Sequence, residues 1–246
     1  MGVYAQKGAT SQLLDRAPSI SWRKKAIELT SLASQSALKT LNAQVALDES
    51  IYTVQRDRPY LIVANHLSYL DVLILSSLFP SVFVTSREIE ATPFLGHFSK
   101  WGGSLFIEHR NRTRLREDIS QLVRTLQTDL RVVLFPEGQT SNGSQLLPFK
   151  GGLLKSALEA GTEVLPICIN YETINKEPVS VLNRDTLFWY SEMTFASHFF
   201  YILNKVHDFS VRVTPLRPFR IDAKTHGAQA AEQCRALIAT QFIPIQ

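Results

Sequence analysis

The chain has 246 residues, of which 45% are hydrophobic and 20% are charged, so it contains enough apolar material for a full core, and global disorder is excluded. This length predicts one large domain, or one domain with a small appendage. A net charge of +4 favours anionic partners without choosing between nucleic acid, phospholipid headgroups and phosphorylated small molecules. Cys168 and Cys234 are the two cysteines, too few for a disulfide framework, which favours a reducing compartment.

The N-terminal region predicts an amphipathic helix from Trp22 to Leu47, headed by the basic run Arg23 to Lys25. Such a helix can lie on an anionic bilayer surface, or it can pack against its own domain, and the pattern leaves both readings open. A break near Asp48–Ser50 divides the chain into an N-terminal helical segment, 1–50, and a main domain, 51–246. The apolar stripe of the helix consists of Leu29, Leu32, Ala33, Ala37 and Leu41.

The chain contains no stretch of the roughly 20 apolar residues that a membrane-spanning helix needs. The longest candidate, Leu70 to Thr85, contains Asp71 and is broken at Pro80. The first residues lack a basic-then-apolar signal pattern, and Gln6 stands where a myristoylation motif wants Ser or Thr. We therefore expect the protein to stay on the side of the membrane where it is made. The mean hydropathy of −0.02 is nevertheless high for a soluble enzyme.

After residue 50, short apolar strands alternate with helices, which predicts an α/β sheet with helices on both faces. In such a fold, ligands bind beyond the carboxyl ends of the strands, here at 65–71, 108–116, 136–150 and from 170 onward. The expected strands are Tyr60–Ala64, Val82–Thr85, Leu105–Ile107, Arg131–Phe135, Val164–Ile169 and Val211–Val213, and the expected helices are Ser68–Leu78, Phe94–Trp101, Leu115–Leu126, Leu153–Ala160 and Ala228–Thr240.

The segment Phe188 to Leu203 (FWYSEMTFASHFFYIL) is rich in aromatic residues. Aromatic side chains of this density favour packing in the core or around a substrate tunnel. A belt at a membrane interface is the second interpretation, because aromatic rings also gather at headgroup level. Neither this segment nor the N-terminal helix establishes membrane binding by itself.

His66 and Asp71 lie in the motif NHLSYLD, directly after the first strand of the main domain. A separation of five residues puts them on different faces of one regular helix. They meet if His66 is on the turn after the strand and Asp71 is in the first helical turn. Asp71 would then orient the imidazole and leave its other nitrogen as a general base. The alternative is a capping box from Ser68 to Asp71 with His66 as a loop residue.

Two further loops carry candidate binding residues. Glu137 and Gly138 follow another strand, where glycine permits close backbone approach and a carboxylate accepts hydrogen bonds from a polyol or from amides. Ordinary turn chemistry explains the same residues. Beyond a third strand, Arg110, Arg112, Arg114 and Arg116 are candidates for a phosphate or carboxylate clamp, and the alternative is a solvated basic helix start.

Together these blocks resemble the glycerolipid (lysophosphatidic acid) acyltransferase family. NHLSYLD resembles the His-x4-Asp motif, REIEATPFLG a second block, GSLFI with the arginines after it a third, and FPEG the Phe-Pro-Glu-Gly block. LLPFKGG and VLPI resemble the segments that follow, so the resemblance runs from about Tyr60 to Ile169. Two positions depart from the pattern. His109 stands in place of the usual arginine, and Gln139-Thr140 replaces Thr-Arg, which bears on the acceptor headgroup.

The resemblance implies a mixed central sheet flanked by helices, and an enzyme that transfers an acyl group to the free hydroxyl of a lysophospholipid, most simply 1-acylglycerol-3-phosphate. The donor would be acyl-CoA or acyl carrier protein, with no metal and no other cofactor, because a thioester is already activated. His66 would be the base and Asp71 its orienting partner. Backbone amides near Gly138 would stabilise the oxyanion, Glu137 would bind the glycerol portion, and Arg110 or Arg112 would bind the phosphate.

The implied setting is the cytoplasmic face of a membrane, with the protein peripheral or monotopic on an anionic surface. Three other functions compete with the first. One is an acyltransferase for another lysolipid, such as lyso-ornithine lipid, which the Gln139-Thr140 departure keeps open. Another is a non-catalytic lipid-surface binding protein. The third, a nucleic-acid binder, is suggested only by the arginine run, and we expect no nucleic acid because aromatic residues are not interleaved with those arginines.

Overall fold

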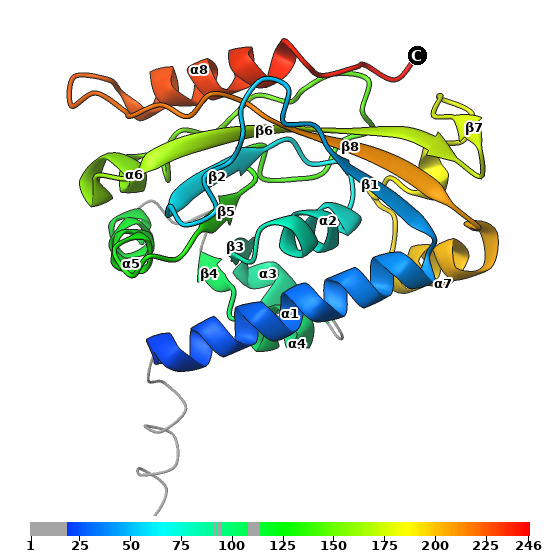
Figure 1. Ribbon diagram of the computed structural model, residues 1–246, viewed down its shortest axis with the longest axis horizontal. Helices are drawn as coiled ribbons and strands as arrows, with labels where there is room; N and C mark the ends of the chain where they lie inside the picture. Colours follow the sequence, from blue (N-terminus) through cyan, green and yellow to red (C-terminus); the bar gives the residue numbers. More distant parts are fainter. Residues whose placement is uncertain (1–18, 91, 93–94, 108–113) are drawn as a thin grey trace, which may run out of the picture.

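A computed structural model describes residues 19–90, 92, 95–107 and 114–246. These residues form an eight-stranded sheet in the order β1-β8-β6-β2-β5-β3-β4, with β7 paired to β6 (Figure 1). The strands are β1 (Ala43–Leu47), β2 (Tyr60–Ala64), β3 (Val82–Ser86), β4 (Leu105–Ile107), β5 (Val132–Leu134), β6 (Glu163–Ile174), β7 (Glu177–Pro178) and β8 (Phe209–Pro215). The helices are α1 (Ile20–Thr40), α2 (Leu70–Leu78), α3 (Arg87–Glu90), α4 (Leu95–Trp101), α5 (Leu115–Leu126), α6 (Lys155–Ala160), α7 (Phe195–Lys205) and α8 (Gly227–Ala239), with a short 3₁₀ turn at Arg184–Thr186.

The sheet is mixed, as the family resemblance implies. β2 lies between β5 and β6 and is parallel to both, while β8 runs antiparallel to β6. Alternate residues of β2 belong to two different cores: Leu61 and Val63 join the cluster that includes α5 and α8, and Ile62 joins the cluster that includes α2. Figure 1 shows α8 on one side of the sheet and α1 and α2 on the other. The prediction of helices on both faces is therefore confirmed.

The prediction that the N-terminal helix reaches Leu47 is wrong at the C-terminal end of the helix. α1 ends at Thr40, and Asn42 has a positive φ of 50° that breaks the helical path. Residues 43–47 then form β1, which pairs in parallel with β8 from Ala43 opposite Phe209 to Leu47 opposite Val213. These residues form a strand because apolar side chains recur at every second position of AQVAL. The side chains at 43, 45 and 47 therefore pack against the core. The division at residue 50 stays a prediction, and β1 adds a strand from the first segment to the common sheet.

α1 contacts the rest of the protein through a different face from the predicted stripe. Its buried residues include Ala26, Ile27 and Leu38, and the helix packs against α2. The interpretation that the helix packs against its own domain is therefore confirmed, but Leu29 and Leu32 are 67% and 60% exposed and take no part in this packing. The basic run is only partly at the surface, because Arg23 is buried while Lys24 and Lys25 are exposed.

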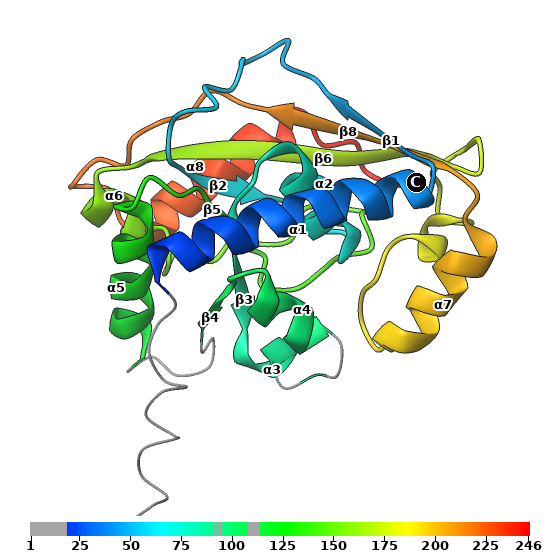
Figure 2. The same cartoon turned by 60° about the horizontal axis from the view of Figure 1, so that its bottom comes forward.

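The aromatic segment also divides between core and surface. Phe188 is fully buried beside Tyr171, with ring centroids 5.3 Å apart. The following residues form α7, where Ile202 is buried and where Phe200, Tyr201 and Leu203 are exposed. Figure 2 shows α7 on the same side of the sheet as α1, away from α8. None of the helices that the structure describes has both the length and the apolar character needed to cross a bilayer.

Candidate active site

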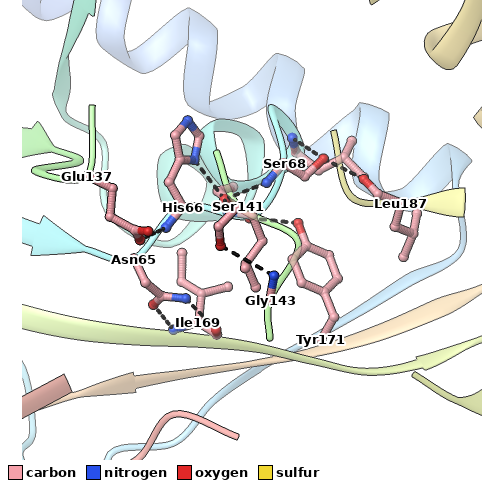
Figure 3. Close-up of polar contacts among 12 residues, drawn as sticks. Asn65, His66, Ser68, Glu137, Ser141, Gly143, Ile169, Tyr171 and Leu187 are labelled. Carbon is pink, nitrogen blue, oxygen red and sulfur yellow. Dashed lines mark hydrogen bonds and ion pairs between the residues drawn. The ribbon is translucent and has the colours of Figure 1, made fainter. Parts of the chain in front are cut away.

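The candidate site lies where β2 ends, between its two parallel neighbours (Figure 3). Asn65 and His66 continue directly from β2, and Glu137 follows β5 after a short turn. Because parallel strands present their carboxyl ends at one edge of a sheet, the loops after β2 and β5 meet there. The sequence prediction that 65–71 and 136–150 share this edge is confirmed by hydrogen bonds between the two loops.

His66 and Asp71 meet as the sequence predicts, with His66 on the turn and Asp71 in the first turn of α2. The distance from His66 Nδ1 to Asp71 Oδ2 is 2.8 Å, and Asp71 is fully buried. A carboxylate only accepts hydrogen bonds, so Nδ1 carries the hydrogen and Nε2 keeps a lone pair. The His66 side chain is 17% exposed, and Figure 3 shows the second nitrogen of its ring pointing away from the nitrogen that makes the dashed contact. This is the arrangement that a general base requires.

Asp71 also performs part of the capping role that was the alternative. Its Oδ2 accepts hydrogen bonds from the backbone amides of Leu67 at 2.7 Å and Ser68 at 2.9 Å. The Ser68 hydroxyl donates to the carbonyl of Leu187 at 2.6 Å and accepts from the Leu70 amide at 3.3 Å. It does not complete a capping box, because the Asp71 amide donates to the Ser68 carbonyl instead. The two interpretations of Asp71 are therefore compatible: one carboxylate orients the imidazole and closes the loop around it.

The His66 ring and backbone are held from the β5 side. The imidazole stacks on Phe135, with ring centroids 3.9 Å apart and planes at 10°. The backbone amide of His66 donates to Glu137 Oε1 at 2.9 Å, and its carbonyl accepts from Ser141 N at 2.9 Å. His66 is thus restrained at its ring, its amide and its carbonyl, which limits the entropy lost when it meets a substrate.

Glu137 is buried, and both of its carboxylate oxygens have backbone partners. Oε1 accepts from His66, and Oε2 accepts from the amide of Leu147 at 3.1 Å. Burial raises the pKa of Glu137 to about 7, against the smaller lowering effect of those two amides. In this geometry Glu137 ties the His66 loop to the loop before Lys150. Its expected contact with the acceptor stays a prediction.

Gly138 has a left-handed conformation with a φ of +72°, and the Lys150 side chain lies over it. A Cβ at this position would lie 2.7 Å from Lys150 Nζ. The Gly138 amide itself donates to the carbonyl of Phe135 at 3.1 Å, so this amide closes a turn rather than pointing at a reacting group. The glycine is required by the turn, and its proposed contact with substrate stays a prediction.

Two residues of the site were missed as functional from the sequence. The Asn65 side chain is fully buried and exchanges two hydrogen bonds with the backbone of Ile169, at 2.8 and 2.9 Å, so it extends the pairing of β2 with β6. Tyr171, further along β6, donates its hydroxyl hydrogen to Asp71 Oδ1 at 2.8 Å. In the sequence, Tyr171 appears only as a polar residue in an apolar strand, which is a weak signal for a role in the site. Its partner Asp71 is 100 residues away, so no local pattern connects the two.

The loop after His66 also contacts the aromatic segment. The Trp189 amide donates to the Leu67 carbonyl at 3.1 Å. The Tyr69 ring meets Phe195 at 5.0 Å between centroids, and its hydroxyl lies 3.2 Å from Nδ1 of the buried His198. The start of α7 is therefore physically joined to the candidate site. Arg110 and Arg112, expected to bind phosphate, lie outside the described residues, and Arg114 and Arg116 begin α5 at the surface.

Part of the sequence is similar to curated acyltransferases. Over 112 residues, which are 45% of this chain and 44% of the relative, the sequence is 43% identical to the 1-acyl-sn-glycerol-3-phosphate acyltransferase of Neisseria gonorrhoeae. Over 159 residues, 62% of this chain and 54% of the relative, it is 31% identical to the lyso-ornithine lipid O-acyltransferase of Rhizobium meliloti. The chain thus spans about half the length of these curated relatives.

The fold is also found in a solved structure. The 1-acyl-sn-glycerophosphate (LPA) acyltransferase of Thermotoga maritima superposes with a TM-score of 0.63 at 16% identity, over 95% of this chain and 85% of the other. At this identity the likeness concerns the fold alone. A model of the family described as Acyltransferase matches residues 45–170, the span that contains β2, α2, β5 and most of β6. The chain belongs to this Acyltransferase family.

Proposed function

We propose that this protein transfers a fatty acyl group from a thioester to the free hydroxyl of a lysophospholipid, with 1-acylglycerol-3-phosphate as the first acceptor to test. The observation that carries the proposal is the His66 to Asp71 hydrogen bond of 2.8 Å at the end of β2. A histidine with Nδ1 held by a buried carboxylate presents Nε2 as a base. The family membership and the names of the relatives support the acyl-transfer chemistry.

In the proposed reaction, Nε2 of His66 removes the hydroxyl proton of the acceptor as the oxygen attacks the thioester carbonyl. The tetrahedral intermediate then collapses, the carbon–sulfur bond breaks, and the imidazolium returns its proton to the leaving sulfur. The products are an ester and a thiol, with no net change at His66. A general base of this kind contributes about 10²–10⁴ in rate. No metal or further cofactor is required by this sequence of steps.

The acceptor and donor sites are also proposals. Arg110 or Arg112 is proposed to bind the acceptor phosphate, and acyl-CoA or acyl carrier protein is the proposed donor. The proposed contact of Glu137 with the glycerol portion requires one of its oxygens to exchange a backbone amide for a substrate hydroxyl. Gly138 and its turn are proposed to border the acceptor, with Lys150 as an additional cation beside them.

The proposed location is the cytoplasmic face of a membrane, with an anionic bilayer surface as the partner. The exposed face of α1 supports it: Lys25, Leu29 and Leu32 follow one another at helical spacing, and all three are exposed. The exposed side chains of α7 on the same side of the sheet give further support. Apolar residues flanked by lysines suit the boundary between lipid headgroups and acyl chains.

A second acceptor class has its own support. Several relatives carry the name lyso-ornithine lipid O-acyltransferase, and the Rhizobium meliloti protein among them matches a longer part of this chain than the Neisseria gonorrhoeae one does. Gln139-Thr140 also replaces the usual Thr-Arg, so one cation of the pattern is missing beside the proposed acceptor site. A zwitterionic acceptor would need less positive charge there than a phosphate monoester.

The test is acyl transfer by the purified protein from one labelled acyl-CoA to a panel of lysolipids, followed by product mass. We expect an ester product with 1-acylglycerol-3-phosphate or lyso-ornithine lipid, and the preferred acceptor decides between the two. His66→Ala should lower kcat by about 10²–10⁴ with unchanged thermal unfolding. His207→Ala is the matched control at an exposed histidine and should keep full activity. Full activity in a folded His66→Ala protein would refute the mechanism.

A further inference from the structure

Among the described residues, the Tyr171 hydroxyl is the hydrogen-bond donor to Oδ1 of Asp71, the carboxylate oxygen that does not bond to His66. Its hydrogen bond to Asp71 Oδ1 is 2.8 Å long, whereas His66, Leu67 and Ser68 all bond to Oδ2. The carboxylate therefore receives four hydrogen bonds, three on one oxygen and one on the other. A hydrogen bond on each oxygen fixes the rotation of the carboxylate about its bond to Cβ, and with it the direction in which Oδ2 faces the imidazole.

The position of Tyr171 on β6 explains how it reaches α2. Leu165, Ile167 and Ile169 point to the α2 side of the sheet at a spacing of two, and Tyr171 continues this series. A register shift follows between Tyr171 and Thr173, where one strand carries an extra residue. Such bulges redirect side chains and strengthen local twist. The irregularity thus lies directly beside the residue whose hydroxyl meets Asp71.

The tyrosine ring is held as firmly as its hydroxyl. Tyr171 is 4% exposed, and its ring packs between Phe188 at 5.3 Å and Phe209 at 6.0 Å between centroids. Burial, and after it the charge of Asp71, raises the pKa of Tyr171 well above its usual range, so the hydroxyl keeps its hydrogen and remains a donor. The hydroxyl is too deeply buried to touch a substrate directly.

We propose that Tyr171 is a positioning residue of the acyl transfer, acting through Asp71 to hold the imidazole of His66 in its productive orientation. This inference rests on the proposed function. The hydrogen-bonded pair of His66 and Asp71 thereby becomes a network of three residues, in which Tyr171 is fixed on β6, a central strand of the sheet. Among the titratable groups of the described residues, Tyr69 interacts electrostatically with Tyr171, and Glu137 interacts with Asp71.

Tyr171→Phe removes the hydroxyl and keeps the ring, so it tests the hydrogen bond alone. We expect kcat to decrease about 10- to 100-fold, which is about 1.4–2.7 kcal/mol at about 1.36 kcal/mol per factor of ten and lies in the range of hydrogen bonds to charged groups. KM for the acceptor should stay within about twofold, because no contact with substrate is removed. A carboxylate that loses a donor holds a protonated imidazole more strongly, so the acidic limb of the pH profile of kcat/KM should move to higher pH.

Tyr60→Phe is the matched control. Tyr60 is fully buried at the opposite end of β2, and its hydroxyl lies 3.0 Å from the hydroxyl of Tyr52. The same atom is lost from the same kind of site, so a general loss of stability should affect both variants alike. We expect Tyr60→Phe to leave kcat and the pH profile unchanged. If both variants lose the same activity with the same pH profile, the positioning role is overturned.

Two further measurements separate this inference from the proposed function. In a double-mutant cycle, Tyr171→Phe should have no further effect on kcat in an Asp71→Asn background, because its action passes through Asp71. A full additional loss there would overturn the inference. In NMR spectra of the protein with ¹⁵N-labelled histidine, Tyr171→Phe should move the titration of the His66 ring, assigned with His66→Gln, and Tyr60→Phe should not. This shift needs no substrate, so it stands even if no acyl transfer is found, and its absence would contradict the inference.

Discussion

The loop between β2 and α2 and the outer face of α1 present their side chains in opposite ways. At the end of the loop, Asp71 is fully buried and receives four hydrogen bonds, and His66 is restrained both by Asp71 and by residues that follow β5. On α1, Leu29 and Leu32 are large apolar residues left mostly exposed. Within the described part of the chain, the helix packs through its other face, through Ala26, Ile27 and the residues that contact α2.

The difference between the two regions separates two kinds of function. A general base must keep one orientation, so its surroundings are rigid and a single lost atom should be costly. A surface that meets a lipid bilayer needs exposed apolar area rather than one fixed geometry. Substitutions in the loop should therefore reduce activity strongly, and substitutions on the outer face of α1 should change partition to membranes with little effect on the fold.

The largest effect is expected for Asp71→Asn. An asparagine has one oxygen in place of two, and its NH₂ group faces donors, so the His66 ring loses its partner or adopts the wrong tautomer. We expect kcat to fall on the order of 10³–10⁴, measured with the preferred acceptor. Asp222→Asn is the control, because Asp222 is exposed and its side chain accepts from the Lys224 amide within a surface turn. A loss below tenfold would mean that Asp71 only caps the helix.

A smaller effect concerns the buried Glu137, and it appears in stability rather than rate. Burial raises its pKa from 4.5 to about 7, so between these pH values the folded protein binds more protons than the unfolded chain. The free energy of unfolding should therefore fall as the pH rises through this window, by about 3 kcal/mol from this one group. Urea unfolding of the wild type and of Glu137→Gln at several pH values measures the difference.

The variant should show a flatter pH dependence than the wild type between pH 4.5 and 7, because it has no proton to release. Glu177→Gln, at an exposed residue of β7, should reproduce the wild-type curve. Parallel curves for the wild type and Glu137→Gln would mean that the pKa of Glu137 is the same in the folded and the unfolded protein, because its two backbone amides would then offset burial. Steady-state kinetics of Glu137→Gln show whether KM for the acceptor changes, as a direct contact between Glu137 and the acceptor would require.

Most strands and helices of this fold follow from local patterns, and so does the meeting of His66 with Asp71. That contact depends on a strand end, a turn and one helical turn, which are all contained in seven residues. The predicted proximity of the β5 loop is also local once both strands are assigned, because ligand sites in open sheets form at strand ends. The strand order itself, with β2 between β5 and β6, has no signature in the sequence.

The parts that escaped prediction depend on pairing between distant segments. Tyr171 reaches Asp71 because β6 lies beside β2 and because its register shifts after residue 171. Asn65 bonds to the backbone of Ile169 because β2 pairs with β6. β1 was missed because a spacing of two in five residues is short, and Leu41 also fits the helical pattern before it. Local periodicity favoured the longer helix, and the pairing with β8 decided otherwise.

The smallest effect on folding is expected for the double variant Leu29→Ser and Leu32→Ser on the exposed face of α1. Surface substitutions of this kind change stability by about 0.5 kcal/mol or less. Burial of a leucine side chain in the interface is worth about 1.5–3 kcal/mol at most, so even partial insertion predicts at least a tenfold loss of partition to anionic vesicles. Val181→Ser with Leu182→Ser is the matched control, because both residues are exposed in a loop near β7. Equal vesicle binding by the α1 variant and the wild type would remove α1 from the proposed membrane surface and leave α7 as the remaining candidate, since its exposed aromatic side chains lie on the same side of the sheet.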